Sequence, residues 1–402
     1  MGSSTFPNPR EKRYNRAMIP PRVYLDYNAT APLRPSAREA MLAALDRLGN
    51  PSSIHAEGRA ARGLLEGARA KIAAGIGTAA RNLVFTSGAT EAANLALTPH
   101  LRTGRDSAPF DLLLLSAGEH PCVLNGHRFP VEQTEILPLT PDGQLSLEAL
   151  EAALLAHRGR RIMLGLQAAN NETGVIQPVQ EAAKLVHAAA GLLVCDATQA
   201  VGRCNATFAT LSANILFLSS HKLGGPAGVG ALAFSDSDLH IDETILRGGG
   251  QEGGRRAGTE NVAAAVGFAS AFEAATGESG ESSRLAGLRD DAERRIAAIL
   301  PEARFLGRNA PRLANSSAFV APGIASHTLA MALDLEGVAA SSGSACSSGK
   351  PRASHVALAM GFKEAAMLRI SLGWRTSAKD VESFGIALAR VVDRIRSRQS
   401  AA

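Results

Sequence analysis

Aromatic residues, cysteines and an excess of one charge are all scarce in this sequence of 402 residues. Phe, Trp and Tyr make up 4% of the chain, and the formal net charge is only +5. Basic and acidic residues are interspersed, which excludes the continuous basic stripe of a nucleic-acid-binding protein. No apolar run approaches the length of a membrane span, and the N-terminus lacks the apolar centre of a secretion signal. We therefore expect a soluble globular protein that is long enough for two domains.

Only four cysteines are present, and their spacing contains neither a C-x-x-C pair nor the pattern of a disulfide framework: Cys122, Cys195, Cys204 and Cys346. This usage predicts a reducing environment, and we expect a cytoplasmic protein. Cys195 lies inside an apolar run and is interpreted as a buried structural residue. Cys346 differs, because it lies in a run of glycine and serine that is too small and polar to pack as a core.

Short apolar runs alternate with helical patterns over most of the chain. The predicted buried strands are 82–85, 112–115, 162–166, 192–195 and 215–218, and the predicted helices include 35–48 (with Ser36 as a cap), 92–97, 146–157, 178–189, 262–275, 284–299 and 378–397. Such alternation predicts an α/β protein with a mainly parallel sheet flanked by helices. The pattern changes near residue 276. We therefore expect a flexible tail over 1–22, a large domain over 23–275, whose first residues can pack with the small domain, and a smaller α+β domain over 276–402.

A lysine and an aspartate follow two successive predicted strands. Lys222 comes after the run 215–218, and Asp196 directly follows the run 192–195. Open α/β folds keep their sites at the carboxyl edge of the sheet, where both residues would lie. Pyridoxal phosphate chemistry needs a lysine that binds the cofactor covalently and a carboxylate that keeps the pyridine nitrogen protonated. Taken singly, Lys222 is more simply a surface lysine and Asp196 a turn or cap residue, but the pair favours a cofactor site.

The segment 86–91 has the form of an anion-binding turn. It follows the predicted strand 82–85 and precedes a helical stretch, so backbone N–H groups and the hydroxyls of Ser87 and Thr90 could surround an anion. An ordinary helix cap is the alternative interpretation. Ser219 and His221, beside Lys222, offer further polar groups for a phosphate.

Three further polar residues follow predicted strands. His120 follows the run 112–115 and could stack on a cofactor ring or transfer protons near neutral pH. A hydrogen-bonded histidine at the rim of the sheet is the alternative. Asn171 and Gln199 could donate hydrogen bonds to a phenolic oxygen, although asparagine also forms turns that need no ligand.

Two residues of the C-terminal region have the properties of a nucleophile and of an anion-binding group. Cys346 lies near Lys350 and Arg352, where a thiol on a flexible loop could act as a nucleophile that travels. Arg369 lies in an apolar stretch, and an arginine directed inward needs an anion. A substrate carboxylate would bind it bidentately, whereas an interdomain salt bridge is the alternative.

Several long motifs occur in order along nearly the whole chain after the tail: Tyr24-Leu25-Asp26, 49–55, 86–91, 170–174, 196–199, His221-Lys222, 256–261, 341–346 and Ser371-Leu372-Gly373. Together they resemble the motifs of the cysteine desulfurases, of the class whose long catalytic-cysteine loop supplies sulfur for iron–sulfur cluster assembly. The resemblance implies a fold-type I homodimer that depends on pyridoxal 5'-phosphate.

The resemblance also implies a role for each site residue. It assigns Lys222 to the covalent link with the cofactor, Asp196 to the pyridine nitrogen and His120 to stacking on the ring. Contacts to the cofactor phosphate are assigned to Ala89, Thr90, Ser219 and His221, and to Thr259 reaching in from the other subunit. Contacts to the ring oxygen are assigned to Asn171 and Gln199. Arg369 with Asn171 is assigned to the substrate carboxylate, and Cys346 to the acceptance of sulfur.

The implied reaction removes sulfur from L-cysteine, leaves L-alanine and a persulfide on Cys346, and delivers the sulfur to an acceptor or iron–sulfur scaffold protein. Lys222 would remove the α-proton, and His120 would assist proton transfers. No resident metal is implied, although Cys346 could transiently ligate a cluster on a scaffold partner; neither nucleic acid nor a membrane is expected as a partner. Two alternatives stay open: a selenocysteine lyase or related β-eliminating enzyme, and a sulfur-delivery scaffold protein with weak activity.

Overall fold

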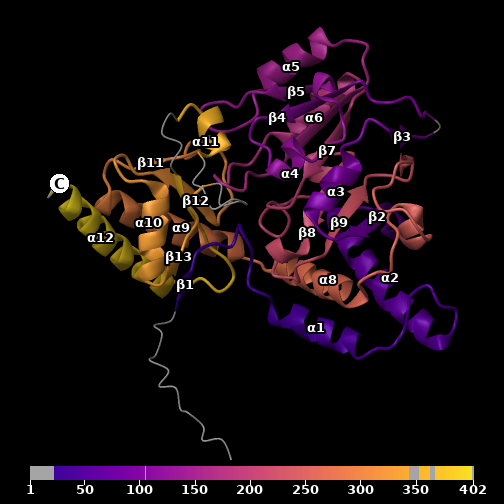
Figure 1. Cartoon of the computed structure of the whole chain (residues 1–402), viewed down its shortest axis with the longest axis horizontal. Coiled ribbons are helices and arrows are strands. Elements are labelled where there is room, and N and C mark those ends of the chain that lie inside the picture. Colours follow the sequence, from indigo (N-terminus) through magenta and orange to yellow (C-terminus); the bar gives the residue numbers. More distant parts are fainter. Residues whose placement is uncertain (1–21, 105, 344–352, 363–366, 401–402) are drawn as a thin grey trace, which may run out of the picture.

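Seven strands form the central sheet, in the order β2-β9-β8-β7-β6-β4-β5 (Figure 1). The structure, a computed structural model, describes residues 22–104, 106–343, 353–362 and 367–400. The strands of this sheet are β2 Leu83–Thr86, β4 Leu112–Ser116, β5 Thr134–Leu137, β6 Ile162–Gln167, β7 Leu192–Asp196, β8 Ile215–Ser219 and β9 Gly230–Phe234. All run in one direction except β9, which is antiparallel to both β2 and β8. The prediction of a mainly parallel sheet in an α/β protein is confirmed.

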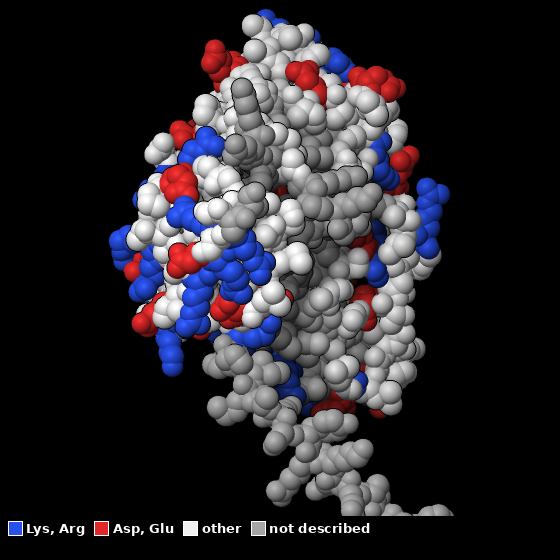
Figure 2. All heavy atoms as spheres, turned by 60° about the vertical axis from the view of Figure 1, so that its left-hand side comes forward, with Lys and Arg blue, Asp and Glu red and all other residues white. Residues whose placement is uncertain are grey.

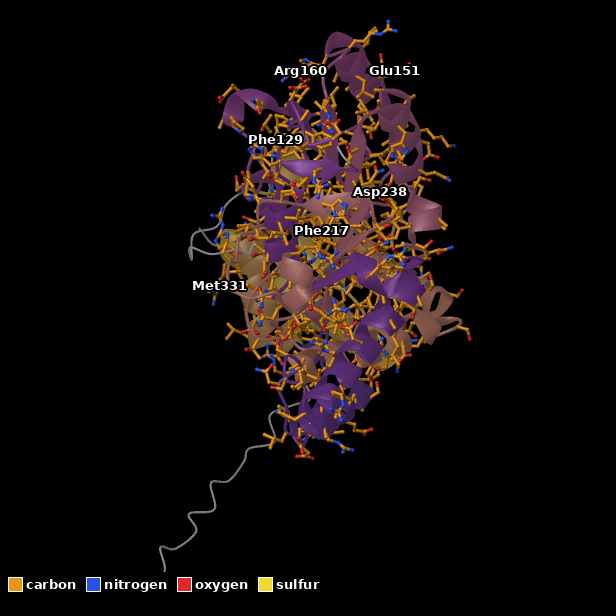
Figure 3. All side chains as sticks on the ribbon, turned by 90° about the vertical axis from the view of Figure 1, so that its right-hand side faces the viewer. Phe129, Glu151, Arg160, Phe217, Asp238 and Met331 are labelled. Carbon is orange, nitrogen blue, oxygen red and sulfur yellow. The ribbon has the colours of Figure 1, made fainter. Side chains whose placement is uncertain are left out.

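The sheet is apolar on both faces, because helices cover both. On β8, Leu216 and Leu218 pack into one core, while Ile215 and Phe217 pack into the core on the opposite face. Figure 3 shows Phe217 in the middle of the molecule. The first face is covered by α1 Pro35–Leu45, α2 Ala56–Ile76, α5 Leu147–Ala156, α6 Val179–Ala188 and α8 Val262–Gly277, and the second by α3 Ala89–Ala96 and α4 Pro121–Leu124.

A smaller antiparallel sheet is formed by the C-terminal part of the chain. Its strands are β11 Arg304–Phe305, β12 Ser316–Val320 and β14 Met367–Ser371, and its neighbouring helices are α9 Glu281–Ile299, α10 Ser326–Leu335, α11 His355–Ala359 and α12 Ala378–Ser400. A separate core joins this sheet to α9, α10 and α12. The first strand, β1 Val23–Tyr24, pairs in parallel with β13 Val338–Ala339, so the start of the described chain lies against its C-terminal part (Figure 1).

Shorter elements complete the fold. A two-stranded antiparallel ladder joins β3 Leu101–Thr103 to β10 Leu239–Ile241. The remaining elements are the short helix α7 Phe208–Leu211 and the 3-10 turns η1 Ala80–Asn82, η2 Val131–Gln133, η3 Ser220–Lys222 and η4 Gln251–Gly254. The turn η3 carries Lys222 directly after β8.

The structure corrects several expected boundaries. The strands β7 and β8 each include one more residue than the apolar run, namely Asp196 and Ser219. The N-cap residue of α1 is Arg34, which makes no side-chain cap bond, and proline follows in the first turn, so the prediction of Ser36 as the cap was wrong. Helix α3 begins at Ala89 and not at Ala92, because the turn residues Thr90 and Glu91 are themselves helical. The strands β5 and β9 were not predicted. For β9 the reason is its content of glycine and alanine, which carry little strand signal.

Charged side chains of both signs cover the face that carries α10 and α12. Figure 2 shows Lys and Arg gathered on part of this face with Asp and Glu among them. On α12, Arg394 pairs with Glu336 and Arg396 with Glu302. In the described part of the chain, no helix combines the length and the apolar character that a membrane crossing requires.

Candidate active site

A cavity of about 400 Å³ lies at the edge of the central sheet where the parallel strands end. Nine of the residues expected at a cofactor site line it together: Ala89, Thr90, His120, Asn171, Asp196, Gln199, Ser219, His221 and Lys222. They come from the ends of β7 and β8, from the start of α3 and from loops after β4 and β6. The common direction of these strands explains why residues spread over more than a hundred positions meet at one edge.

Lys222 extends its amine toward two backbone carbonyls. Its Nζ donates to Asn28 O at 2.6 Å and to Ala29 O at 2.8 Å. Burial, and then the charges of Arg203 and Arg369, lower the pKa of Lys222 to about 8. The turn that holds Lys222 needs glycine at Gly224, whose φ is +83° and where a Cβ would lie 2.8 Å from Pro32 O. The lysine is therefore much closer to its neutral form at physiological pH than an exposed lysine would be.

Asp196 and His120 face the same cavity. Asp196 accepts from Thr198 N at 2.9 Å and forms no ion pair with any residue that the structure describes. Burial raises the pKa of this carboxyl, against the opposing effect of hydrogen bonds from Thr198 and of the charges of His120 and Lys222. Nδ1 of His120 accepts from Cys122 N at 3.1 Å, which places the ring proton on Nε2. Burial lowers the pKa of His120, so this ring is neutral near pH 7.

The N-terminus of α3 opens into the cavity beside Thr90. Gly88 precedes the helix and supplies no side-chain cap, so the first N–H groups of α3 have no capping side chain. The backbone approaches β9 closely here, because a Cβ on Gly230 would lie 2.7 Å from Gly88. Burial lowers the pKa of the adjacent His221 to about 4, with Lys222 and Arg203 acting in the same direction. This end of the cavity offers hydrogen-bond donors to an anion.

Arg369 lies on β14 and reaches Asn171 across the junction of the two sheets. Its Nη1 donates to Asn171 O at 2.8 Å and its Nη2 to Asp26 Oδ1 at 2.6 Å. The salt bridge considered as the alternative role of Arg369 is therefore present. Arg369 is only 5% exposed, yet its buried Nε has no hydrogen-bond partner. A buried donor without a partner is costly, and a carboxylate would satisfy it.

Asn28 contacts several residues of the site, and the sequence interpretation missed it. Its backbone N donates to Ser371 Oγ at 2.9 Å, and its amide Nδ2 donates to Ser316 Oγ at 2.8 Å and Asn171 O at 3.1 Å. Its carbonyl accepts from Lys222, as described above, and from Gln199 Nε2 at 3.1 Å. Asn28 thus joins the small sheet to the cavity. Its position two residues after the motif Tyr24-Leu25-Asp26 was the signal that the sequence offered.

The described cysteines are poor nucleophiles. Cys122 lines the cavity, but burial and the charges of Asp196 and Glu119 raise the pKa of its thiol. Burial also raises the pKa of Cys195, inside β7, and raises that of Cys204 to about 11. Because the thiolate is the nucleophile, these three residues are held in their unreactive form. Cys346 lies outside the described residues.

The chain on both sides of the Cys346 segment is anchored beside the cavity. On one side, Ser341 and Arg369 exchange two backbone hydrogen bonds, at 3.0 and 2.7 Å. On the other, Ser354 donates to the buried carboxylate of Glu172, and Nε2 of His355 lies 2.9 Å from Glu119 O. The segment therefore starts and ends next to residues that adjoin the site.

Two of the expected site residues that the structure describes do not line the cavity: Arg369, whose contacts are given above, and Thr259. Thr259 is exposed. The glycine-rich loop that carries it is held by Glu252, which binds Arg69 at 2.6 Å, and by Arg256, whose Nε donates to Glu91 at 3.0 Å. These contacts hold the loop to its own chain and leave Thr259 at the surface.

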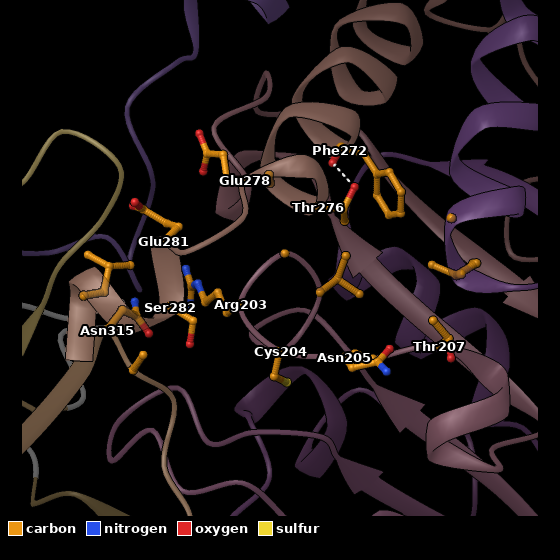
Figure 4. Close-up of a pocket in the computed structure, with 18 residues that line it drawn as sticks. Arg203, Cys204, Asn205, Thr207, Phe272, Thr276, Glu278, Glu281, Ser282 and Asn315 are labelled. Carbon is orange, nitrogen blue, oxygen red and sulfur yellow. Dashed lines mark hydrogen bonds between the residues drawn. The ribbon is translucent and has the colours of Figure 1, made fainter. Parts of the chain in front are cut away.

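A second cavity, of about 420 Å³, is shown in Figure 4. Arg203, Cys204 and Thr276 are among its lining residues, together with Glu281 and Asn315 of the C-terminal part. None of the expected site residues lines this cavity. The chemistry of the first cavity, with its lysine, unpaired carboxylate and uncapped helix, makes the first the candidate active site.

Comparison with known proteins gives the same picture over nearly the whole chain. The family model of the class-V aminotransferases matches residues 23–384. A curated relative, the cysteine desulfurase of Cereibacter sphaeroides, is 38% identical over 385 residues, which are 94% of this chain and 97% of the relative. The IscS-like cysteine desulfurase of Mycobacterium tuberculosis is 37% identical over 392 residues, covering 94% and 98%.

A solved structure has the same fold. The NifS-like protein from Rickettsia africae superposes with a TM-score of 0.83 at 30% identity, covering 92% of this chain and 99% of that chain.

Proposed function

The chain belongs to the class-V aminotransferase family and, within it, to the cysteine desulfurases, and from this premise we propose that it removes sulfur from L-cysteine and transfers it to Cys346. The products are L-alanine and a persulfide on Cys346. The observation that carries the proposal is the cavity that unites Lys222, Asp196, His120 and the uncapped start of α3.

Enzymes of this family depend on pyridoxal 5'-phosphate, and the cavity fits this cofactor. The uncapped N-terminus of α3, with Thr90, Ser219 and His221, suits the phosphate. The unpaired carboxylate of Asp196 suits a protonated pyridine nitrogen, whose charge would offset the cost of burying it. When bound through Lys222, the cofactor supplies an electron sink for the bonds at the substrate α-carbon.

The residues of the chain handle the protons and the substrate. Nζ of Lys222, with its lowered pKa, accepts and returns the proton at the α-carbon of the substrate. With the cofactor bound, neutral His120 would stack on its ring and offer Nε2–H for proton transfer. Asn171 and Gln199 would donate to the ring oxygen, and the Nε of Arg369 would bind the substrate carboxylate.

Cys346 takes up the sulfur. Its thiolate attacks the sulfur of L-cysteine, a new S–S bond forms, and the C–S bond of the substrate breaks with its electron pair passing to carbon. Protonation of that carbon yields L-alanine, so the reaction of cysteine and one enzyme thiol to alanine and one persulfide is balanced. The raised pKa values of the thiols of Cys122, Cys195 and Cys204 support Cys346 in this role.

Mass spectrometry after addition of L-cysteine tests the proposal. We expect a gain of one sulfur atom on Cys346 in the protein loaded with pyridoxal phosphate, and equal formation of L-alanine. Cys122→Ala should keep both, and Cys346→Ala should lose both while keeping the colour of the bound cofactor. Selenocysteine separates desulfurase from lyase chemistry, because a lyase needs no cysteine nucleophile. Release of selenium by Cys346→Ala from selenocysteine would indicate a lyase. A protein that binds no pyridoxal phosphate would refute the function.

The same proposal includes a homodimer in which Thr259 of one subunit contacts the phosphate at the site of the other. Support comes from the exposed position of Thr259 and from the anchoring of its loop by Glu252 and Arg256. We also propose that the chain divides into a cofactor-binding domain up to residue 275 and a small domain from residue 276. We further propose delivery of the sulfur to an acceptor or iron–sulfur scaffold protein in the reducing cytoplasm, which the free thiols of Cys122, Cys195 and Cys204 suit.

A further inference from the structure

Arg203 lies behind Lys222 and donates hydrogen bonds to several segments at once. Its Nη1 donates to Gln199 Oε1 and, at 2.9 Å, to Asn28 Oδ1. Its Nη2 lies 3.3 Å from the carbonyl oxygens of Tyr27 and Lys222. All of these acceptors are neutral oxygens, and the guanidinium pairs with no carboxylate that the structure describes. Arg203 is half-buried and has no counter-ion, so its charge is spent on orienting neutral oxygens of Gln199, Asn28, Tyr27 and Lys222.

The contact with Gln199 determines which way the glutamine amide faces. Oε1 accepts from Arg203, and Nε2 donates to Asn28 O at 3.1 Å. Turning the amide over would bring its NH₂ group against the guanidinium, donor against donor, and its oxygen against a carbonyl oxygen. Arg203 therefore excludes the flipped orientation.

The Asn28 carbonyl then brings two functional groups together. It accepts from Gln199 Nε2 and also from Lys222 Nζ at 2.6 Å. Because both donors bind one oxygen, they lie side by side, and both residues line the cavity. The second N–H of Gln199 stays available for a ligand beside the lysine.

We propose that Arg203 is a positioning residue of the desulfurase reaction, which fixes the Gln199 amide so that its N–H donor lies beside the amine of Lys222. The inference rests on the proposed function, in which this N–H binds the ring oxygen of pyridoxal phosphate. The side chain of Arg203 acts through its hydrogen bonds to Gln199 and Asn28.

The charge of Arg203 has a second consequence for Lys222. The charged groups around this amine are Arg203 and Arg369, which disfavour its protonated form, and Asp196 and Asp26, which favour it. The imidazoles of His120 and His221 complete its surroundings, and both are neutral near pH 7 because burial lowers their pKa values. Loss of the Arg203 charge should therefore raise the pKa of Lys222 toward that of an exposed lysine.

Affinity for pyridoxal phosphate, measured by absorbance titration of the cofactor-free protein, tests the positioning. Arg203→Lys keeps the charge but loses the planar fork, and Arg203→Met loses both. Both should weaken binding about 10- to 100-fold, the effect of losing a hydrogen bond to a charged group. Arg161→Met is the matched control. Arg161 is also partly buried, but it precedes β6, whereas the cavity lies at the other end of this strand. It should bind the cofactor as the unaltered protein does.

The pH dependence of cofactor incorporation separates charge from geometry. The midpoint of the pH profile of the incorporation rate should move to higher pH in Arg203→Met. In Arg203→Lys it should stay where it is in the unaltered protein. In Arg203→Ala, guanidinium ion far below unfolding concentrations should restore affinity by way of the second cavity, of about 420 Å³, which Arg203 lines (Figure 4). Affinities within twofold of the unaltered protein in both Lys and Met variants, or an equal loss in Arg161→Met, would overturn the proposal. These titrations use no cysteine, so they can fail or succeed independently of desulfurase activity.

Discussion

Nη2 of Arg369 donates to Oδ1 of Asp26 at 2.6 Å, and this ion pair joins residues 343 positions apart. Asp26 follows β1, which pairs with β13, and Arg369 lies on β14. The aspartate holds the guanidinium in one orientation and leaves its buried Nε without a partner. In the proposed role of Arg369, the substrate carboxylate would meet an arginine that is already oriented, which would lower the entropy cost of binding.

Arg369→Lys should raise the KM for L-cysteine about 10- to 100-fold, because a lysine cannot present the free Nε–H in the same plane. Steady-state kinetics of the loaded enzyme measure this change. Arg390→Lys on the exposed face of α12 is the control and should leave KM unaltered. An unaltered KM in Arg369→Lys would show that the substrate carboxylate binds elsewhere.

Asp26→Asn should act mainly on stability. The asparagine can still accept from Nη2, but the buried guanidinium loses its counter-charge, and the free energy of unfolding should fall by about 1–3 kcal/mol. Urea unfolding of the cofactor-free protein measures this loss. The rise in KM should be much smaller than in Arg369→Lys; equal increases would contradict this division of roles.

Incorporation of pyridoxal phosphate should accelerate with rising pH and level off above about pH 8. Only the neutral amine of Lys222 attacks the aldehyde, and burial with the charges of Arg203 and Arg369 lowers the pKa of this lysine to about 8. Stopped-flow absorbance of the cofactor-free protein gives the profile. A rate that continues to climb toward pH 10 would indicate an ordinary, exposed lysine.

Asp196→Asn should weaken pyridoxal phosphate binding and yet stabilise the cofactor-free protein at pH 7. Burial raises the pKa of Asp196 in the folded state, so the unfolded state loses its proton first as pH rises. Stability from this group is present in acid and is lost as pH rises through the raised folded pKa. As the pH rises from 4 to 7, the free energy of unfolding in urea should therefore fall less in Asp196→Asn than in the unaltered protein. Identical pH dependence in the two proteins would rule out an unpaired buried carboxylate.

Mixed dimers test the placement of Thr259. Lys222→Ala and Thr259→Ala homodimers should each be impaired, the first completely. If Thr259 serves the other subunit's site, a mixed dimer of the two variants contains one site with both defects and one site with neither. Activity should then recover to about half of that of the unaltered dimer. No recovery in a dimer of verified composition would place Thr259 at the site of its own chain.

The local sequence was enough to predict the parts of the fold and site that depend on short-range patterns. Apolar runs of four residues, each followed by a polar side chain, indicated β7 and β8, and with them the common edge where Asp196 and Lys222 lie. The reason is physical: parallel strands buried on both faces must be apolar throughout, so the first polar residue marks the carboxyl edge. The strand β9 escaped prediction, because alanine and glycine carry little strand signal.

Which partners these residues acquire was decided only by the tertiary structure. The ion pair of Arg369 with Asp26, the bonds of Asn28 to Ser316 and Ser371, and the hold of Arg203 on Gln199 depend on packing the small sheet against the cavity. Nothing in the local pattern of a buried arginine distinguishes a substrate clamp from a salt bridge. The structure shows the salt bridge on Nη2 of Arg369, and Nε is the nitrogen left for the proposed clamp. The sequence determined which chemical groups reach the edge of the sheet. Long-range contacts determined their orientation and their charge state, and left the buried Nε of Arg369 without a partner.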